Sequence, residues 1–188
     1  MEIKRSPKKE IEATIVDPID ISTEAVETID YAHHEIHSGS HYYVQGFIEL
    51  SNTGTFNIKL VTPNTLSWSH FLFKITSTGI CSTTLLEGAT GGMTGGSNVT
   101  PINNNRNSLK ASGMVLTSDV TVATSSVTTL ENDKWGADGF KETIGGGSSR
   151  SDELILKQNT TYLRTFVSGA DDNIIQFKAS WYEHVNKN

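Results

Sequence analysis

The feature that most constrains the fold of this chain is a two-residue hydrophobic period that recurs from residue 42 onward. Residues 56–60 alternate strictly between apolar and polar side chains, and longer runs repeat this pattern. Successive side chains of a strand point to opposite faces, so the period predicts strands with one buried face. Gly, Asn and Pro separate the runs and predict turns. The expected strands cover residues 42–50, 56–60, 68–75, 85–86, 114–116, 120–124, 153–156, 161–167 and 174–182.

Only one segment of the sequence has a helical period. Apolar residues recur at helical spacing between residues 24 and 37, after an N-cap candidate at Ser22, and Gly39 is expected to end this helix. The absence of alternating strands and helices argues against a parallel sheet. The prediction is a mainly β fold: an antiparallel β-sandwich of jelly-roll or Greek-key type, with one short N-terminal helix and an extended N-terminal arm.

Two connections carry further expectations. Residues 88–108 are rich in Gly and Asn and contain little to bury, which predicts a long loop. Residues 161–167 and 174–182 both alternate and are joined by turn-forming residues, which predicts an antiparallel hairpin.

The sequence divides into an N-terminal arm, residues 1–23, and a single β-sandwich domain, residues 24–188. A length of 188 residues is typical of one domain. The arm contains two prolines and a short alternating stretch, which favours a solvated terminal segment or one that docks on another subunit. Its residues of interest are four basic and three apolar ones: Lys4, Arg5, Lys8, Lys9, Ile11, Ile15 and Val16.

Composition excludes several classes of partner. The formal net charge of −6 disfavours binding to phosphate backbones, so no nucleic-acid partner is expected. No stretch approaches the roughly 20 apolar residues of a transmembrane helix, so no membrane partner is expected. The single cysteine, Cys81, cannot form an internal disulfide, which agrees with assembly in a reducing cytoplasm. Its position in an expected strand predicts a buried, inert thiol.

Four of the six histidines fall within nine residues, from His33 to His41. His33 and His37 are spaced so that a helix would place both imidazoles on one face, as a zinc site requires. The run His-Glu-Ile-His is one residue short of the zincin pattern, and a third ligand would have to come from His41, His70 or His184. We expect no metal and no cofactor, with a metal-binding or pH-sensing role for His33 and His37 as the alternative.

The sequence contains no recognisable catalytic set. It has no Gly-x-Ser-x-Gly elbow, and its Asp171-Asp172 pair lies in an expected turn, where aspartate commonly bonds the backbone. The glycines of residues 91–96 are not followed by the Lys-Ser/Thr ending of a phosphate loop. We therefore expect no enzymatic activity.

The three tryptophans are the strongest candidates for a contact surface. Trp68 and Trp181 lie in alternating runs and are expected in the core. Trp135 stands between Lys134 and Gly136 in an expected loop, where an exposed indole would contact either a protein or a glycan.

Several separated motifs, covering roughly residues 30 to 185, resemble a widespread group of tailed-bacteriophage virion proteins. The motifs occur in the following order: residues 32–39 (AHHEIHSG), 62–64 (TPN), 86–89 (LEGA), 100–108 (TPINNNRNS), 156–163 (LKQNTTYL) and 181–184 (WYEH).

This resemblance implies a structural protein of the phage particle, assembled in the host cytoplasm, which decorates or cements the capsid exterior. It implies contacts with the major capsid protein and a homo-oligomer, with a trimer favoured. Ile11, Ile15 and Val16 would then anchor the arm on a neighbouring subunit by adding a strand, and the basic residues would meet an acidic capsid surface. The alternative is a host-recognition module on a head fibre or tail that binds surface glycan through Trp135.

Overall fold

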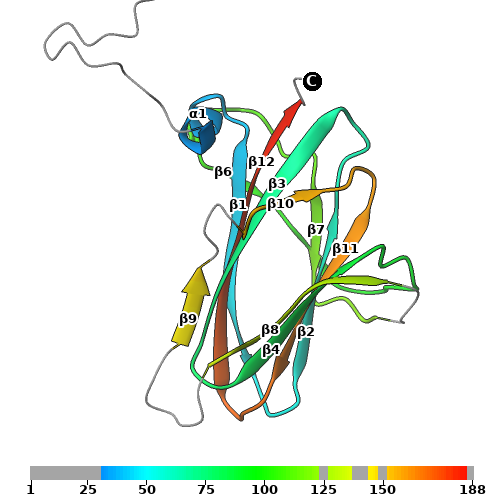
Figure 1. Cartoon of the computed structure of the whole chain (residues 1–188). Helices are drawn as coiled ribbons and strands as arrows, with labels where there is room; N and C mark the ends of the chain where they lie inside the picture. Colours follow the sequence, from blue (N-terminus) through cyan, green and yellow to red (C-terminus); the bar gives the residue numbers. More distant parts are fainter. Residues whose placement is uncertain (1–30, 123–126, 137–143, 148–151, 186–188) are drawn as a thin grey trace, which may run out of the picture. The chain divides into compact units, whose positions relative to one another are not determined.

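The protein folds into two six-stranded antiparallel sheets (Figure 1). The structure is a computed structural model and describes residues 31–122, 127–136, 144–147 and 152–185. The first sheet has the order β10-β3-β12-β1-β6, and β9 also pairs with β3. It contains β1 (His41–Leu50), β3 (Ser67–Ser77), β6 (Ile102–Asn103), β9 (Ile144–Gly147), β10 (Leu154–Leu156) and β12 (Asn173–Val185).

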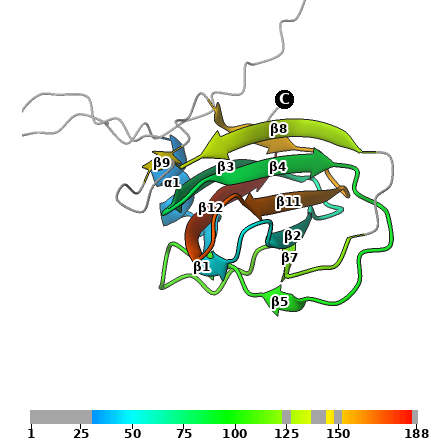
Figure 2. The same cartoon turned by 90° about the horizontal axis from the view of Figure 1, so that it is seen from below.

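The second sheet has the order β5-β7-β2-β11-β4-β8, which Figure 2 shows in succession. It contains β2 (Thr55–Val61), β4 (Cys81–Glu87), β5 (Ser97–Val99), β7 (Val115–Ser118), β8 (Thr128–Trp135) and β11 (Thr161–Ser168). Every described pairing in both sheets is antiparallel. The predicted mainly β, antiparallel β-sandwich with one short helix is therefore confirmed.

The hydrophobic core lies between the sheets because alternate residues of each central strand face inward. In β12, Phe177 is buried between the exposed Gln176 and Lys178, and Trp181 is buried four residues further along the strand. Phe166 of β11 meets Phe177 across the core at a ring-centroid distance of 5.6 Å. Trp181 is fully buried, as predicted, whereas Trp68 is half-buried.

The predicted hairpin of residues 161–167 and 174–182 is wrong. Strand β11 pairs with β2 and β4, whereas β12 pairs with β1 and β3, so the connection crosses from one sheet to the other. Asn173 fixes this crossing: its side chain accepts hydrogen bonds from Ser77 Oγ (2.8 Å) and Gly79 N (2.8 Å) and donates to Ile80 O (2.9 Å). Alternation shows which face of a strand is buried but not which strand lies beside it.

The predicted loop over residues 88–108 is also partly wrong, because this segment contains the short strands β5 and β6. Asn103 is buried and donates from its amide nitrogen to the carbonyls of Gly39 (2.9 Å) and Lys110 (3.1 Å). Backbone pairing and asparagine hydrogen bonds order this segment, together with Met93 and Val99, which pack against buried residues. Val120 is buried and Thr121 forms an isolated bridge with Thr94 in place of the expected strand; residues 123–124 lie outside the described residues.

Helix α1 (Tyr31–His37) precedes β1 and ends as the sequence predicts. Gly39 has φ +73°, and the N–H groups of Ser38 and Gly39 donate to the carbonyls of His34 (2.9 Å) and Ile36 (3.0 Å). The earlier part of the predicted helix and the whole predicted arm, with Lys4, Arg5, Lys8, Lys9, Ile11, Ile15 and Val16, lie outside the described residues.

Candidate functional site: a polar cleft between β3 and β8

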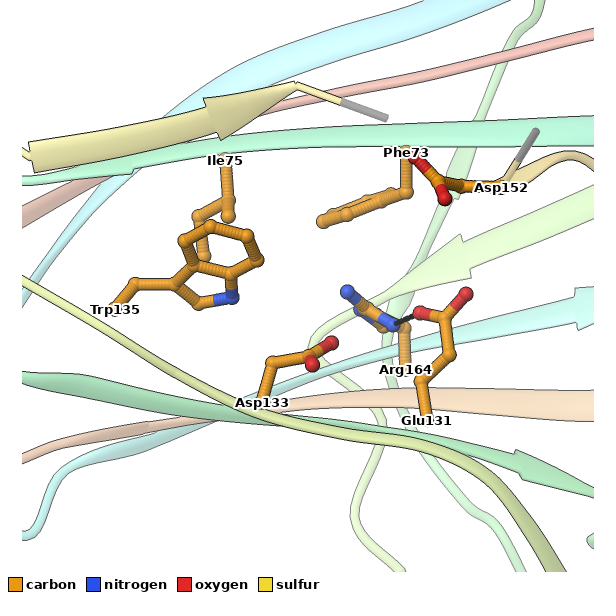
Figure 3. Close-up of a pocket in the computed structure, with 7 residues that line it drawn as sticks. All are labelled: Phe73, Ile75, Glu131, Asp133, Trp135, Asp152 and Arg164. Atoms are coloured by element: carbon orange, nitrogen blue, oxygen red, sulfur yellow. Dashed lines mark hydrogen bonds and ion pairs between the residues drawn. The ribbon is translucent and has the colours of Figure 1, made fainter. Parts of the chain in front are cut away.

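A cleft of about 260 Å³ opens between the two sheets where β3 faces β8 (Figure 3). Strand β3 contributes apolar side chains, β8 contributes two carboxylates and an indole, and β11 contributes a guanidinium. The lining residues are Phe73, Ile75, Glu131, Asp133, Trp135, Asp152 and Arg164.

Strand β8 shapes the cleft through its alternation. Glu131, Asp133 and Trp135 are half-buried on the inner face, while Asn132 and Lys134 are exposed. The strand pairs with β4 with one register shift between Leu85 and Leu86, and Cys81 lies opposite Trp135. Polar residues therefore occupy inward positions that the central strands fill with apolar side chains, and this leaves a cavity instead of core packing.

Among the described residues, Arg164 is the only arginine or lysine that is buried between the two sheets. It shares the inward face of β11 with Tyr162 and Phe166, and it is 2% exposed. Its Nη1 forms an ion pair with Glu131 Oε2, and Nη2 donates to Thr83 Oγ1 at 3.4 Å. The guanidinium carbon also lies 4.1 Å from the centre of the Phe73 ring, a cation–π contact.

Burial lowers the pKa of Arg164, and the carboxylates of Glu131 and Asp133 oppose this shift. An arginine whose charge is kept by two carboxylates is a fixed donor, not a proton-transfer group. The cleft is therefore suited to binding a ligand through hydrogen bonds.

Two N–H donors at the cleft have no acceptor among the described residues. They are the indole Nε1 of Trp135 and the Nε of Arg164, and both atoms are buried. Figure 3 shows the indole nitrogen and the guanidinium turned toward the same space, with the Asp133 carboxylate beside it. A buried donor without an acceptor costs about 1–3 kcal/mol, so a ligand that supplies acceptors here would gain free energy.

The prediction that Trp135 is an exposed loop residue is wrong. Trp135 is the last residue of β8, half-buried, and its ring packs against the core. The signal for a strand was present in the sequence as the alternation of Glu131, Asp133 and Trp135 before Gly136. Gly136 has φ +89° and lies so close to Gly79 that a Cβ atom would be 2.0 Å from the Gly79 carbonyl oxygen.

The predicted adjacency of His33 and His37 is confirmed, but no third ligand group lies beside them in the part of the chain that the structure describes. Their Nε2 atoms are 3.0 Å apart and both side chains are exposed on one face of α1. Within the described ranges, no group of three or more His, Cys, Asp or Glu side chains is arranged to hold a metal ion. Helix α1, which carries both histidines, has seven residues. No helix in the described ranges is both long enough and apolar enough to cross a membrane.

Three further histidines, His41, His70 and His184, lie at the same end of the first sheet. His70 Nδ1 is 2.5 Å from Glu153 Oε1, and Tyr182 donates its hydroxyl to the same oxygen at 2.8 Å. His70 stacks on Tyr182 at 4.4 Å, with His184 at 4.6 Å from His70. His41 stacks on the other side of Tyr182 at 6.4 Å. These three histidine rings therefore pack against one another and against Tyr182.

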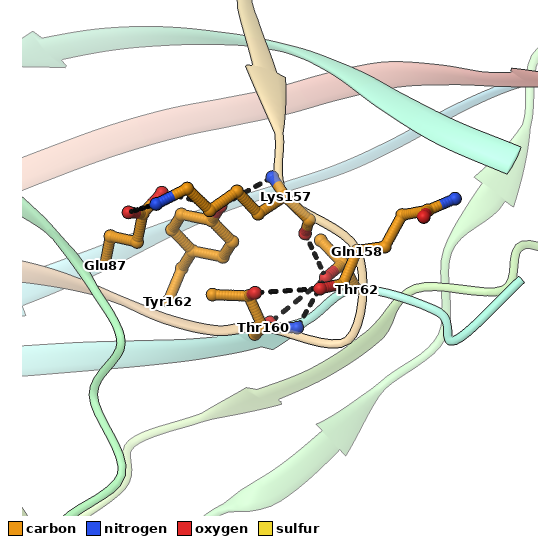
Figure 4. A network of polar contacts seen from close by, with 6 residues as sticks. All are labelled: Thr62, Glu87, Lys157, Gln158, Thr160 and Tyr162. Carbon is orange, nitrogen blue, oxygen red and sulfur yellow. Dashed lines mark hydrogen bonds and ion pairs between the residues drawn. The ribbon is translucent and has the colours of Figure 1, made fainter. Parts of the chain in front are cut away.

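Three of the motifs quoted from the sequence converge in one polar network (Figure 4). Thr62 accepts from Thr160 N (2.9 Å) and donates to Lys157 O (2.6 Å). Tyr162 donates its hydroxyl to Glu87 (3.0 Å), and Glu87 also pairs with Lys157 Nζ at 2.6 Å. The hydrogen bond from Lys157 is the main cause of a lowered pKa at Glu87.

Two other motifs meet at the end of α1. Asn103 donates to Gly39 O, and Asn105 Nδ2 donates to His37 O at 3.0 Å. A Cβ atom on Gly39 would lie 2.2 Å from Ser108 Oγ, so only glycine fits there. The histidine-rich helix end is therefore held by the asparagine-rich loop, which is a structural role.

Comparisons with protein-family models, with curated proteins and with solved structures each returned no match.

Proposed function

We propose that this protein is a non-enzymatic structural component of a bacteriophage particle, which decorates or cements the capsid exterior as a homotrimer in contact with the major capsid protein. The ordered set of motifs that resembles phage virion proteins carries this proposal. The fold is compatible with it. Its two antiparallel sheets support the proposal, because viral capsid proteins use double-sheet jelly rolls.

The exposed apolar residues supply contact surfaces for such a role. Leu66 is 77% exposed and Leu109 is fully exposed. Their loops adjoin, because Gly113 packs against Pro63. Large apolar side chains left in solvent at one end of a domain are typical of surfaces that a partner covers.

The open edge of β1 supplies a docking site for the arm of a neighbouring copy. Strand β1 pairs with β12 along its whole length, but β6 covers only Tyr42 and Tyr43. Among the described strands, none pairs with this edge from Val44 to Leu50. The alternating residues Ile11, Ala13 and Ile15 of the arm are suited to add a strand there.

The direction of the backbone groups identifies which residues would pair with the arm. On the β6 side, Asn104 N donates to His41 O, and on the β12 side Glu183 N donates to Ser40 O. Peptide groups alternate sides along an antiparallel strand, so Gln45, Phe47 and Glu49 direct their N–H and C=O groups to the open edge.

The decisive test of the proposed function is the location and copy number of the protein in purified particles. A particle reconstruction should place it on the outside of the capsid at local symmetry axes, with a copy number comparable to that of the major capsid protein. A few copies confined to the tail or to one vertex would refute decoration.

The role of the arm is tested by the substitution Phe47→Pro, which removes one edge N–H without removing a bond to β12. Phe47→Ala is the matched control, because it removes the same ring and keeps the N–H. We expect Phe47→Pro and deletion of residues 1–20 to lower retention on heads, and Phe47→Ala to lower it less. Unchanged retention after the deletion would exclude the arm from attachment.

A further inference from the structure

We propose that the cleft between β3 and β8 binds a neutral saccharide unit, through Trp135, Asp133 and Arg164. This site is additional to the proposed capsid role and does not depend on it, since it rests on the chemistry of the cleft. Three properties of the lining select the ligand: its unpaired donors, its charge and its size.

The unpaired donors require acceptors. Trp135 Nε1 and Arg164 Nε are buried at the cleft without a partner among the described residues. An ammonium group, such as a lysine side chain, has three donors and no acceptor, so it would leave both N–H groups unsatisfied. The occupant must therefore carry oxygen or nitrogen acceptors.

The charge of the lining disfavours an anion. Three carboxylates face one guanidinium, which leaves a net charge of −2 at neutral pH. A phosphate or carboxylate ligand would satisfy the donors but would be repelled by Asp133, Asp152 and Glu131. A neutral ligand with hydroxyl groups meets both conditions, because each hydroxyl can accept from Trp135 or Arg164 and donate to a carboxylate.

The size and the apolar wall favour a single sugar ring. A volume of about 260 Å³ is below the range of drug-sized pockets, roughly 300–1,000 Å³. Phe73 and Ile75 form an apolar wall against which the C–H groups of a pyranose would pack. Asp152, an exposed member of the lining, marks the solvent side, toward which a longer glycan would extend.

The test uses the full ¹⁵N-labelled chain, whose three tryptophans give three indole N–H signals by NMR. The probes are D-glucose, D-galactose, D-mannose and N-acetyl-D-glucosamine, each raised through the millimolar range. We expect at least one to shift the Trp135 signal while the Trp68 and Trp181 signals stay in place. Inorganic phosphate and methylamine serve as the anionic and cationic probes, and neither should shift it.

Variants then separate binding from folding, and their affinity is followed by the backbone amide signals of the same ¹⁵N-labelled chain, because Trp135→Phe has no Trp135 indole signal. Trp135→Phe keeps an aromatic ring but removes the N–H, and Asp133→Asn keeps the size but removes the charge. Each should weaken binding about three- to tenfold, the effect of losing one hydrogen bond. Trp68→Phe is the matched control and should bind like the wild type.

The proposal is overturned if none of the four sugars shifts the Trp135 signal, or if phosphate or methylamine binds more tightly than every sugar. Wild-type affinity in both Trp135→Phe and Asp133→Asn would also overturn it. The wild-type titration remains decisive even if Trp135→Phe does not fold.

Discussion

Removal of Glu131 is expected to destabilise the protein more than removal of its ion-pair partner Arg164. The substitution Glu131→Ala leaves the guanidinium buried, with only 2% of Arg164 exposed. Breaking a buried pair in this way costs about 3–5 kcal/mol. The lower end applies here, because the Glu131 side chain is 27% exposed and the charge of Asp133 also acts on Arg164. We therefore expect a loss of about 3 kcal/mol.

The substitution Arg164→Met should be far less harmful. It removes the desolvated charge, and a methionine of similar length can keep contact with the Phe73 ring. The expected change in unfolding free energy is within about 1 kcal/mol of the wild type. The double variant Glu131→Ala/Arg164→Met should resemble Arg164→Met, because no buried cation then remains unpaired.

Urea unfolding measures these differences. With a slope of about 2 kcal/mol/M, a loss of about 3 kcal/mol lowers the midpoint by about 1.5 M. The melting temperature should fall by roughly 6–12 °C, at 2–4 °C per kcal/mol for a chain of this size. Glu49→Ala, at an exposed position of β1, is the control and should leave the midpoint unchanged. If the double variant is as unstable as Glu131→Ala alone, the reasoning about a buried unpaired charge is refuted.

Three further predictions concern buried groups elsewhere in the sandwich. Asn173→Ala should lower the unfolding free energy by about 2 kcal/mol, because the buried Gly79 N loses its acceptor, while Ser77 Oγ keeps Gly79 O and Ile80 O keeps Gly169 N; a melting temperature near that of the wild type would contradict this. Burial raises the pKa of the Cys81 thiol to about 11, so a disulfide reagent at pH 8 should label it only in urea, and labelling of the native protein would count against its burial. Burial, and then Lys178, lower the pKa of His41 below 6.5, against a smaller opposing effect of Glu35. The unfolded chain then binds more protons, so this contribution to stability is complete above pH 6.5 and is lost as the pH falls through the folded-state pKa. His41→Asn should remove up to about 1.4 kcal/mol per pH unit of that slope, measured by urea unfolding from pH 7 to 5, and an unchanged slope would exclude His41 as its source.

The sequence was sufficient for the fold class and for most strands, because alternation follows directly from the pleat of a half-buried strand. It was not sufficient for the partners of those strands. Phe166 and Phe177 have the same inward alternation whether they share a sheet or face one another across the core. Which of the two arrangements forms depends on the connection at Asn173, where the chain passes from one sheet to the other. The hydrogen bonds of Asn173 to Ser77 and Gly79 connect segments that are distant in sequence.

The candidate site was harder to predict because its residues break the rule that located the strands. Glu131 and Asp133 occupy inward positions of β8, and a polar residue at an inward position obscures the alternation of apolar side chains. Arg164 presents the same difficulty in β11, where it stands between the buried Tyr162 and Phe166. Only the three-dimensional arrangement brings these polar residues together with Trp135.

The motifs behind the phage resemblance and the residues of the cleft therefore carry different information. Thr62, Glu87 and Lys157 join three motifs at one corner, and Gly39 and Asn103 join two more at another. Such contacts determine the scaffold. Glu131, Asp133 and Trp135 belong to none of those motifs, although they form one wall of the cleft. A protein that shared the motifs would be expected to share the sandwich, whereas its ligand would depend on what it carries on the strand equivalent to β8.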